Sequence, residues 1–529
     1  MAPLLTVRNL TAATVTLKSL ERFEEPNTKR SKATAFPSAL KNAQTIAPSA
    51  PELGLHSQSF QRQDLDVELA PFESYTLRLH PLEESNHKPT SSLSSTTLRL
   101  TIQNGENERF RIDTNPTYTQ KGSRMLTPLT PNPSTSYTAL YHPTTATAHL
   151  TIHTHHLPDY AKWMQSLPDT LPLSAISIPG THNSHTHYRA LPSVRCQVVD
   201  IKTQLENGIR FLDIRVQPIS PRDTSKRDLY LVHGAFFIVL TGAKYLDPVL
   251  DACYAFLEAN PSETILVSLK REGMGRATDP HLATILERHY FAPNASKWYT
   301  GNTIPYLRSA RGKLVLVRRY KVSPSASPDP DADADAYACT DADEEQDQEK
   351  GDPAPGLDAT AWPNNVPHAL HGPFTVQDSC DVAHPSAIPA KLAHATAHLV
   401  RAAAATHPVP GATTDATHPV PPGPVSLNFL SGSNFFHRGT WPERIASVVN
   451  RGVEEWVCAG HHLAVLGGDP PMDVRVPGGR RAGVRGVGEG DGGAGVVVMD
   501  MVGEGGNWDL VRLVVGLNMG ILSKVRVGM

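Results

Sequence analysis

Two histidines stand directly after short apolar runs, together with cations that could act on a phosphate ester. His182 lies in G-T-H-N-S and His233 in V-H-G. Arg215, in D-I-R, and Lys270, in S-L-K-R-E, could hold an anionic phosphate through charge-assisted hydrogen bonds. Imidazole exchanges a proton near neutral pH, so a pair of imidazoles beside a phosphate supports general base and general acid catalysis of an in-line displacement.

Carboxylates and further cations follow neighbouring apolar runs. Asp213 lies two residues before the arginine of the same D-I-R motif, so both side chains point to one face of a strand. Asp500 ends the run V-V-V-M-D, and a carboxylate beside a histidine orients the ring and favours its charged form. R-R-Y supplies a cation from Arg318 or Arg319, and V-Q-D supplies Asp378.

The apolar runs predict the parallel sheet that would bring these residues together. From about residue 170 they alternate with amphipathic helical stretches, which is typical of βα units. The expected strands are 175–179, 210–216, 229–232, 264–269, 313–318, 374–377, 425–430 and 495–499. Side chains at the carboxyl ends of barrel strands converge on one pocket. We therefore predict a distorted TIM-type (β/α)8 barrel with the site at that end.

A separate all-β domain is expected before the barrel. Residues 1–155 contain short runs that alternate apolar and polar residues, separated by Pro, Asn, Gly and Ser, and predict an antiparallel β-sandwich. The expected domains are therefore 1–155 and 156–529. Segments 323–358, 406–424 and 476–495 are acidic, Pro-rich and Gly/Arg-rich. We expect them to be disordered insertions, with His407 and His418 solvated.

Composition excludes several classes of protein. The 529 residues include 49 Lys and Arg against 52 Asp and Glu, so a generally basic nucleic-acid binder is excluded. No run approaches the roughly 20 apolar residues of a membrane span. The first residues do not resemble a secretory signal, and five scattered cysteines argue against a disulfide framework. We predict a cytoplasmic protein without a transmembrane segment, for which peripheral membrane contact is possible.

The motifs I-S-I-P-G-T-H-N-S, Q-L-E-N-G-I-R-F-L-D-I-R-V and L-Y-L-V-H-G closely resemble the X domain of phosphatidylinositol-specific phospholipase C. The resemblance is to the bacterial, calcium-independent branch and its fungal relatives, and it is dense over residues 171–320. It implies cleavage of phosphatidylinositol-type lipids at a membrane surface to diacylglycerol and inositol cyclic phosphate, with no metal and no cofactor. Residues 235–240, A-F-F-I-V-L, either enter the lipid interface or pack under the barrel rim.

The resemblance also implies roles for individual residues. His182 matches the general base, Asp500 its carboxylate partner and His233 the general acid. Asp213 and Arg215 match the D-x-R pair, in which the guanidinium takes the place of a calcium ion beside the phosphate. The residues expected to bind substrate are Asn183, Lys270, Arg318 and Asp378.

Three departures from the family pattern keep two alternatives open. Asn183 stands where the bacterial enzymes have an aspartate, Asn364 replaces an aspartate of the sugar pocket, and Cys380 replaces an aromatic residue. One alternative is a metal-dependent, glycerophosphodiester phosphodiesterase-like barrel, although no acidic residue close to His182 supplies a metal ligand. The other is a catalytically weak module that binds a lipid headgroup.

Overall fold

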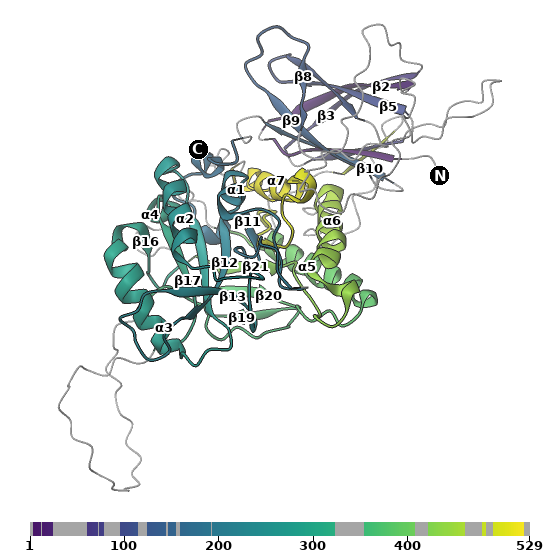
Figure 1. The fold of residues 1–529 in the computed structure, drawn as a ribbon. Helices are drawn as coiled ribbons and strands as arrows, with labels where there is room; N and C mark the ends of the chain where they lie inside the picture. The colour runs from purple at the N-terminus through teal and green to yellow at the C-terminus, as the bar shows by residue number, and fades with distance from the viewer. Residues whose placement is uncertain are drawn as a thin grey trace, which may run out of the picture.

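The computed structural model describes residues 4–11, 13–24, 61–71, 73–78, 96–114, 124–143, 147–154, 159–191, 193–322, 354–407, 422–460, 479–482 and 490–522. An all-β part precedes a larger α/β part, and helices α6 and α7 lie between the two (Figure 1). None of the helices in these ranges combines the length and the apolar character needed to cross a membrane.

The N-terminal part consists of two sheets, ordered β22-β4-β1-β10-β9-β7 and β3-β2-β5-β6-β8. Their strands are β1 (Leu4–Asn9), β2 (Val15–Glu24), β3 (Gln61–Leu69), β4 (Ser74–Arg78), β5 (Thr96–Asn104), β6 (Arg109–Thr114), β7 (Arg124–Met125), β8 (Thr127–Pro128), β9 (Tyr137–Pro143), β10 (Thr147–Thr154) and β22 (Gly479–Ala482). Alternate apolar residues such as Val7 on β1 and Ile102 on β5 meet in one core, as expected of a sandwich. The sandwich is not purely antiparallel, because β1 pairs in parallel with β10.

Parts of the expected disordered insertions are ordered. Strand β22 comes from within 476–495 and pairs antiparallel with β4. His407 was expected to be solvated, but its side chain is 8 % exposed and its Nδ1 lies 3.0 Å from Oδ2 of the buried Asp491. In the first insertion Leu357 is buried on a short strand. The expectations for 323–353, 408–421, 476–478 and 483–489, His418 included, lie outside the described residues.

The α/β part is built on one curled sheet with the order β16-β17-β15-β12-β11-β23-β21-β20-β19. Its strands are β11 (Ile178–Thr181), β12 (Phe211–Pro218), β13 (Leu229–His233), β14 (Phe236–Phe237), β15 (Ile265–Arg271), β16 (Trp298–Tyr299), β17 (Leu314–Arg319), β18 (Leu357–Asp358), β19 (Ala369–His371), β20 (Phe374–Gln377), β21 (Val425–Phe429) and β23 (Val496–Met499). The helices are α1 (Ile201–Glu206), α2 (Asp247–Ala259), α3 (Asp279–Leu286), α4 (Leu307–Ala310), α5 (Ile388–Ala404), α6 (Pro442–Gly460) and α7 (Asp509–Gly516). The prediction of a mixed α/β fold around a parallel sheet is confirmed.

Two details of the predicted barrel are wrong. The expected third parallel strand is β13, which pairs antiparallel with β12. Its connection, residues 219–228, is too short for a helical crossover, which needs a dozen or more residues. In addition, no strand pairing within the described residues joins β17 and β18 to β19 and β20, so the sheet curls without closing.

Helix α6 joins the sandwich to the sheet. It contacts β1 and β10, and Nη1 of Arg8 on β1 donates to the carbonyl oxygen of Val457 near the end of the helix. Carbonyl groups in the last turn of a helix have no partner within the helix, so a cation there is stabilising. The hydroxyl of Thr151 on β10 lies 3.6 Å from Sγ of Cys458. The N-terminal sandwich is therefore packed against the α/β part through α6.

Glu454 on α6 gives this junction a pH dependence. Burial, together with the negative charge of Asp509, raises the pKa of Glu454 to about 8. An unfolded chain releases this proton near pH 4.3, so the contribution of Glu454 to stability falls as the pH rises from about 4 to 8. We expect Glu454→Gln to remove this loss, so that its melting temperature relative to wild type is higher at pH 8 than at pH 5. The matched control is Glu455→Gln, an exposed neighbour, whose difference from wild type should be the same at both pH values.

Candidate active site

Strands of the curled sheet bring the predicted residues together, although β13 is antiparallel to β12. His182 follows β11, Asp500 follows β23 and His233 ends β13. The strand register aligns Arg215 on β12 with Lys270 on β15. Since successive side chains of a strand point to opposite faces, the period-two spacing places Arg215 and its motif partner on the same face.

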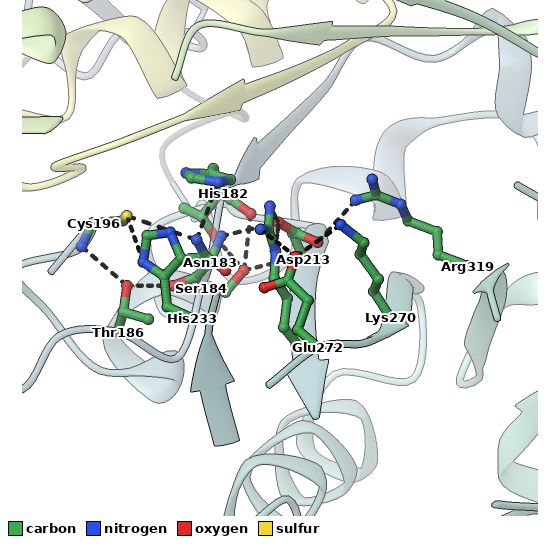
Figure 2. A network of polar contacts seen from close by, with 12 residues as sticks. His182, Asn183, Ser184, Thr186, Cys196, Asp213, His233, Lys270, Glu272 and Arg319 are labelled. Atoms are coloured by element: carbon green, nitrogen blue, oxygen red, sulfur yellow. Dashed lines mark hydrogen bonds and ion pairs between the residues drawn. The ribbon is translucent and has the colours of Figure 1, made fainter. Parts of the chain in front are cut away.

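The two histidine rings lie side by side, as Figure 2 shows. Their centroids are 5.9 Å apart, and the ring planes are perpendicular. His182 donates from Nδ1 to Oδ1 of Asp500 at 2.9 Å, and the side chain of Asp500 is 1 % exposed. This bond orients the ring and places the lone pair of the neutral imidazole on Nε2, where Asn183 donates from Nδ2 at 3.1 Å.

His233 is held by the loop before α1. Its Nδ1 donates to the carbonyl oxygen of Val194 at 2.9 Å. Burial, together with the positive charges of Arg215 and His182, lowers the pKa of His233 to about 3. The ring is therefore neutral at pH 7 in the ligand-free protein, and an anion beside Arg215 would raise its pKa by offsetting that charge.

Arg215 is the centre of a cluster of charges. It donates from Nη2 to Oδ2 of Asp213 at 3.1 Å and from Nη1 to Oε1 of Glu272 at 2.8 Å. Lys270 donates to the same Glu272 oxygen at 2.7 Å. Burial opposes ionisation of both carboxyls, but the neighbouring cations outweigh it: they lower the pKa of Asp213 and bring the pKa of Glu272 to about 2. Both carboxylates therefore remain charged and hold the guanidinium in place.

The structure corrects the prediction for Arg318. Arg319, which aligns with Lys270 in the register of β15 and β17, extends Nη1 to 3.5 Å from Oδ1 of Asp213. Its guanidinium carbon also lies 4.0 Å from the ring centroid of Trp362. Arg318 points away: it donates to the carbonyl oxygens of residues 355 and 320. Alternation along the strand therefore puts Arg319, rather than Arg318, in the cluster.

Asn183 and Asp378 lie at the border of the cluster. Asn183 is fully buried with a φ of 43°, a left-handed conformation that asparagine tolerates better than most residues. Its backbone N–H lies 3.2 Å from Oδ2 of Asp213. Asp378 follows β20, and its negative charge acts on both Arg215 and Arg319. Burial lowers the pKa of Arg319 overall, whereas the carboxylates around Arg215 outweigh burial and raise its pKa. Both residues are thus close enough to influence a ligand bound at the cations.

Three residues of the site were missed by sequence reasoning. Glu272 also accepts from the backbone N–H of Gly234 at 2.9 Å, which ties the His233 loop to Arg215. Its position two residues after Lys270 was a usable signal. Gln197 donates from Nε2 to the carbonyl oxygens of His182 and of residue 499, at 2.8 and 2.9 Å, and so connects β11 with β23. Cys196 and Gln197 come from an irregular loop without a motif, so nothing in the sequence pointed to them.

The geometry defines a two-histidine, arginine-centred site at the carboxyl end of a parallel sheet. Residues 170–320 match the family model of the phosphatidylinositol-specific phospholipase C X domain. The predicted resemblance is therefore confirmed.

Curated relatives and a solved structure are similar to this chain. The chain is 33 % identical over 167 residues to a 1-phosphatidylinositol phosphodiesterase of Listeria monocytogenes, covering 30 % of this chain and 48 % of that protein. A protein of the same name from Staphylococcus aureus is 33 % identical over 165 residues, covering 30 % and 50 %. The chain thus spans about half the length of these curated relatives. A phosphatidylinositol-specific phospholipase C structure from Listeria monocytogenes aligns with 20 % identity and a TM-score of 0.44, over 68 % of this chain and 99 % of that one.

Proposed function

We propose that this protein is a phosphatidylinositol-specific phospholipase C-type phosphodiesterase. It would cleave phosphatidylinositol-type lipids to diacylglycerol and inositol cyclic phosphate without a metal ion. The observation that carries the proposal is the pair of perpendicular imidazoles 5.9 Å apart. One of them is oriented by Asp500, and the other lies close enough to Arg215 for the guanidinium to lower its pKa.

In the proposed reaction the two histidines exchange protons with the substrate. Nε2 of His182 takes the proton of the inositol 2-hydroxyl, whose oxygen attacks phosphorus and closes the cyclic phosphate. The bond between phosphorus and the glycerol oxygen breaks, and His233 gives its proton to that leaving oxygen. The ring of His182 ends protonated and that of His233 neutral, so proton exchange with solvent restores the starting state.

The charges of the cluster support this sequence of steps. Arg215 is proposed to stabilise the charge that develops on the phosphoryl oxygens, and its bonds to two carboxylates keep it in position. An arriving phosphodiester would offset the charge of Arg215 and raise the pKa of His233, which would prepare this ring to act as the acid. Lys270, Arg319 and Asp378 are proposed to bind the inositol hydroxyls, and Asn183 to orient His182.

The test is to incubate the protein with phosphatidylinositol vesicles, with and without a chelator, and to measure diacylglycerol and inositol cyclic phosphate. Both products in equal amounts, undiminished by the chelator, would support the proposal. Activity that the chelator abolishes would favour the metal-dependent alternative. Binding to the vesicles without products would favour the headgroup-binding module.

An exposed apolar rim lies next to the proposed site. We define the aromatic rim as Phe236, Phe237, Leu240, Phe435 and Phe436, all exposed, with Phe436 at 93 %. The rings of Phe236 and Phe435 stack with centroids 5.5 Å apart, which joins the two loops that carry the rim. Phe236 pairs with His233 in the hairpin of β13 and β14. Exposed apolar patches beside a site mark interaction surfaces, and we propose that the rim enters the lipid surface.

The aromatic rim makes a prediction about vesicle binding. The variant Phe237→Ser with Phe436→Ser should weaken partitioning onto phosphatidylinositol-containing vesicles by at least about tenfold, since burying one such ring is worth roughly 1.5–3 kcal/mol. Vesicle sedimentation measures this partitioning. Leu129→Ser, at an exposed apolar residue of the N-terminal part, is the control and should bind as wild type. Equal binding by all three proteins would exclude the rim as the membrane contact.

Two broader predictions remain proposals. We propose that the sandwich and the α/β part are separate domains, 1–155 and 156–529, although β22 and α6 connect them. We also propose a cytoplasmic protein that reaches its lipid through peripheral contact by the aromatic rim.

A further inference from the structure

Cys196 brings a thiol next to both histidines and has no part in the proposed reaction. Its Sγ lies 3.8 Å from Nδ1 of His233 and 3.8 Å from Nδ2 of Asn183 (Figure 2). Metal-binding atoms of His182, Cys196 and Asp500 all lie within 4.8 Å of one another. Imidazole nitrogen, thiolate sulfur and carboxylate oxygen are the ligand types of zinc sites in proteins.

Two buried oxygens at this cluster lack a hydrogen-bond donor within the described residues. They are Oδ2 of Asp500, whose side chain is 1 % exposed, and Oδ1 of Asn183, a residue with no exposed surface. Buried acceptors of this kind are rare, because leaving them without a partner is costly. A cation bound next to Asp500 would satisfy this carboxylate oxygen. The missing donor at Oδ2 is an observation independent of the spacing of the three ligands.

The ligand types select the kind of ion. Bond lengths of about 2.3 Å to sulfur and about 2.0 Å to nitrogen put neighbouring ligand atoms of a tetrahedral zinc ion roughly 3–4 Å apart. Side-chain rotations that bring the most distant ligand atoms of His182, Cys196 and Asp500 about 1 Å closer would therefore let all three bind one ion. Calcium and magnesium take oxygen ligands, so a thiol in the set disfavours them and favours Zn²⁺, Cd²⁺ or Co²⁺.

We propose that His182, Cys196 and Asp500 form a binding site for a thiophilic divalent cation of the Zn²⁺ class, and that the bound ion inhibits the enzyme. Binding stands on the cluster alone, whereas inhibition rests on the proposed function. The ion would occupy His182, the proposed base, and add positive charge beside His233, which has to be protonated. A thiol loses its proton when it binds such an ion, so binding releases a proton and strengthens as the pH rises.

Cobalt absorption tests the site without any lipid. Titrating wild type with Co²⁺ should produce a sulfur-to-cobalt charge-transfer band that Zn²⁺ removes and Ca²⁺ does not. Cys196→Ser should lack the band, and His182→Gln, which keeps the thiol, should bind Co²⁺ at least about tenfold more weakly. Cys253→Ser removes another buried thiol, on α2, and is the matched control, with the band expected unchanged. Circular dichroism and thermal unfolding verify that each variant is folded.

Two outcomes would overturn the proposed metal site: the absence of a band in wild type, which requires no variant, or its retention in folded Cys196→Ser.

The second part of the experiment adds Zn²⁺ to the vesicle assay. Inhibition of wild type that a chelator reverses, and that is at least about tenfold weaker in Cys196→Ser, would support the inhibitory role. Cleavage that Zn²⁺ leaves unchanged while the band is present would refute inhibition. A band in a protein that cleaves no lipid would support the metal site and contradict the proposed function.

Discussion

The variant His182→Ala is expected to lower the turnover of phosphatidylinositol by about 10²–10⁴-fold while the fold remains intact, because a positioned general base contributes that much. His182 is the residue that Asp500 orients through a bond of 2.9 Å, and its Nε2 is the atom proposed to take the 2-hydroxyl proton. His233→Ala should cause a loss of similar size, since it removes the proposed acid. Initial rates of inositol cyclic phosphate release from vesicles measure both effects.

A histidine of the same loop provides the control. The ring of His187 packs against that of Tyr188 in a tilted arrangement, with centroids 3.9 Å apart. His187→Ala should retain activity within a few-fold of wild type. The assignment of base and acid would be refuted if His182→Ala or His233→Ala, folded by circular dichroism, turned over lipid at a near-native rate.

The variant Arg215→Ala should lose both activity and stability. Removing a preorganised cation from the phosphate site is expected to cost about 10²–10³-fold in turnover. The same change leaves Asp213 and Glu272 without their shared guanidinium partner, and breaking a buried ion pair typically costs about 3–5 kcal/mol. Urea unfolding at pH 7 measures the stability, and the vesicle assay measures the turnover.

The loss of stability should depend on pH in a defined direction. Arg215 lowers the pKa of Asp213 and of Glu272 in the folded state, so the stability that these carboxylates contribute is present above their unfolded pKa of about 4. It is lost as the pH falls through the lower folded values. The deficit of Arg215→Ala relative to wild type should therefore be largest near pH 7 and shrink on acidification.

Arg215→Lys separates charge from geometry. It retains a positive charge but cannot make the paired bonds of a guanidinium to Asp213 and Glu272, so its stability should lie between wild type and Arg215→Ala. Its turnover should remain strongly reduced, because a single ammonium cannot hold the same position. Wild-type turnover in Arg215→Lys, or unchanged stability in Arg215→Ala, would contradict the role given to this residue.

The parts of the site that depend on local spacing were predictable. Asp213 and Arg215 share a strand face because they are two residues apart, and their side chains do bond to each other. His182 and Asp500 were predicted to converge because each follows a parallel strand, and the structure brings them together. His233 joins them as well, although its strand β13 is antiparallel to β12. Strand ends and period-two alternation are properties of short segments, so a single sequence contains them.

Strand register and strand direction were harder to predict from the sequence. Arg318 and Arg319 are adjacent and point to opposite faces, and only the pairing of β15 with β17 determines that Arg319 aligns with Lys270. The apolar run of β13 looked like a parallel strand, but its direction depends on how the chain returns after β12. In both cases the deciding contacts join segments that are far apart in the chain or depend on the course of a loop.

The sequence by itself determined the class of protein, the alternation that places Asp213 with Arg215, and the position of the two histidines at the ends of strands. Only the tertiary structure decided that Glu272 holds Arg215, that Gln197 links β11 to β23, and that the thiol of Cys196 lies beside His233. The physical reason is that these three contacts depend on where irregular segments and separate strands meet after packing. No periodic pattern of residue types in the sequence indicates where these segments meet.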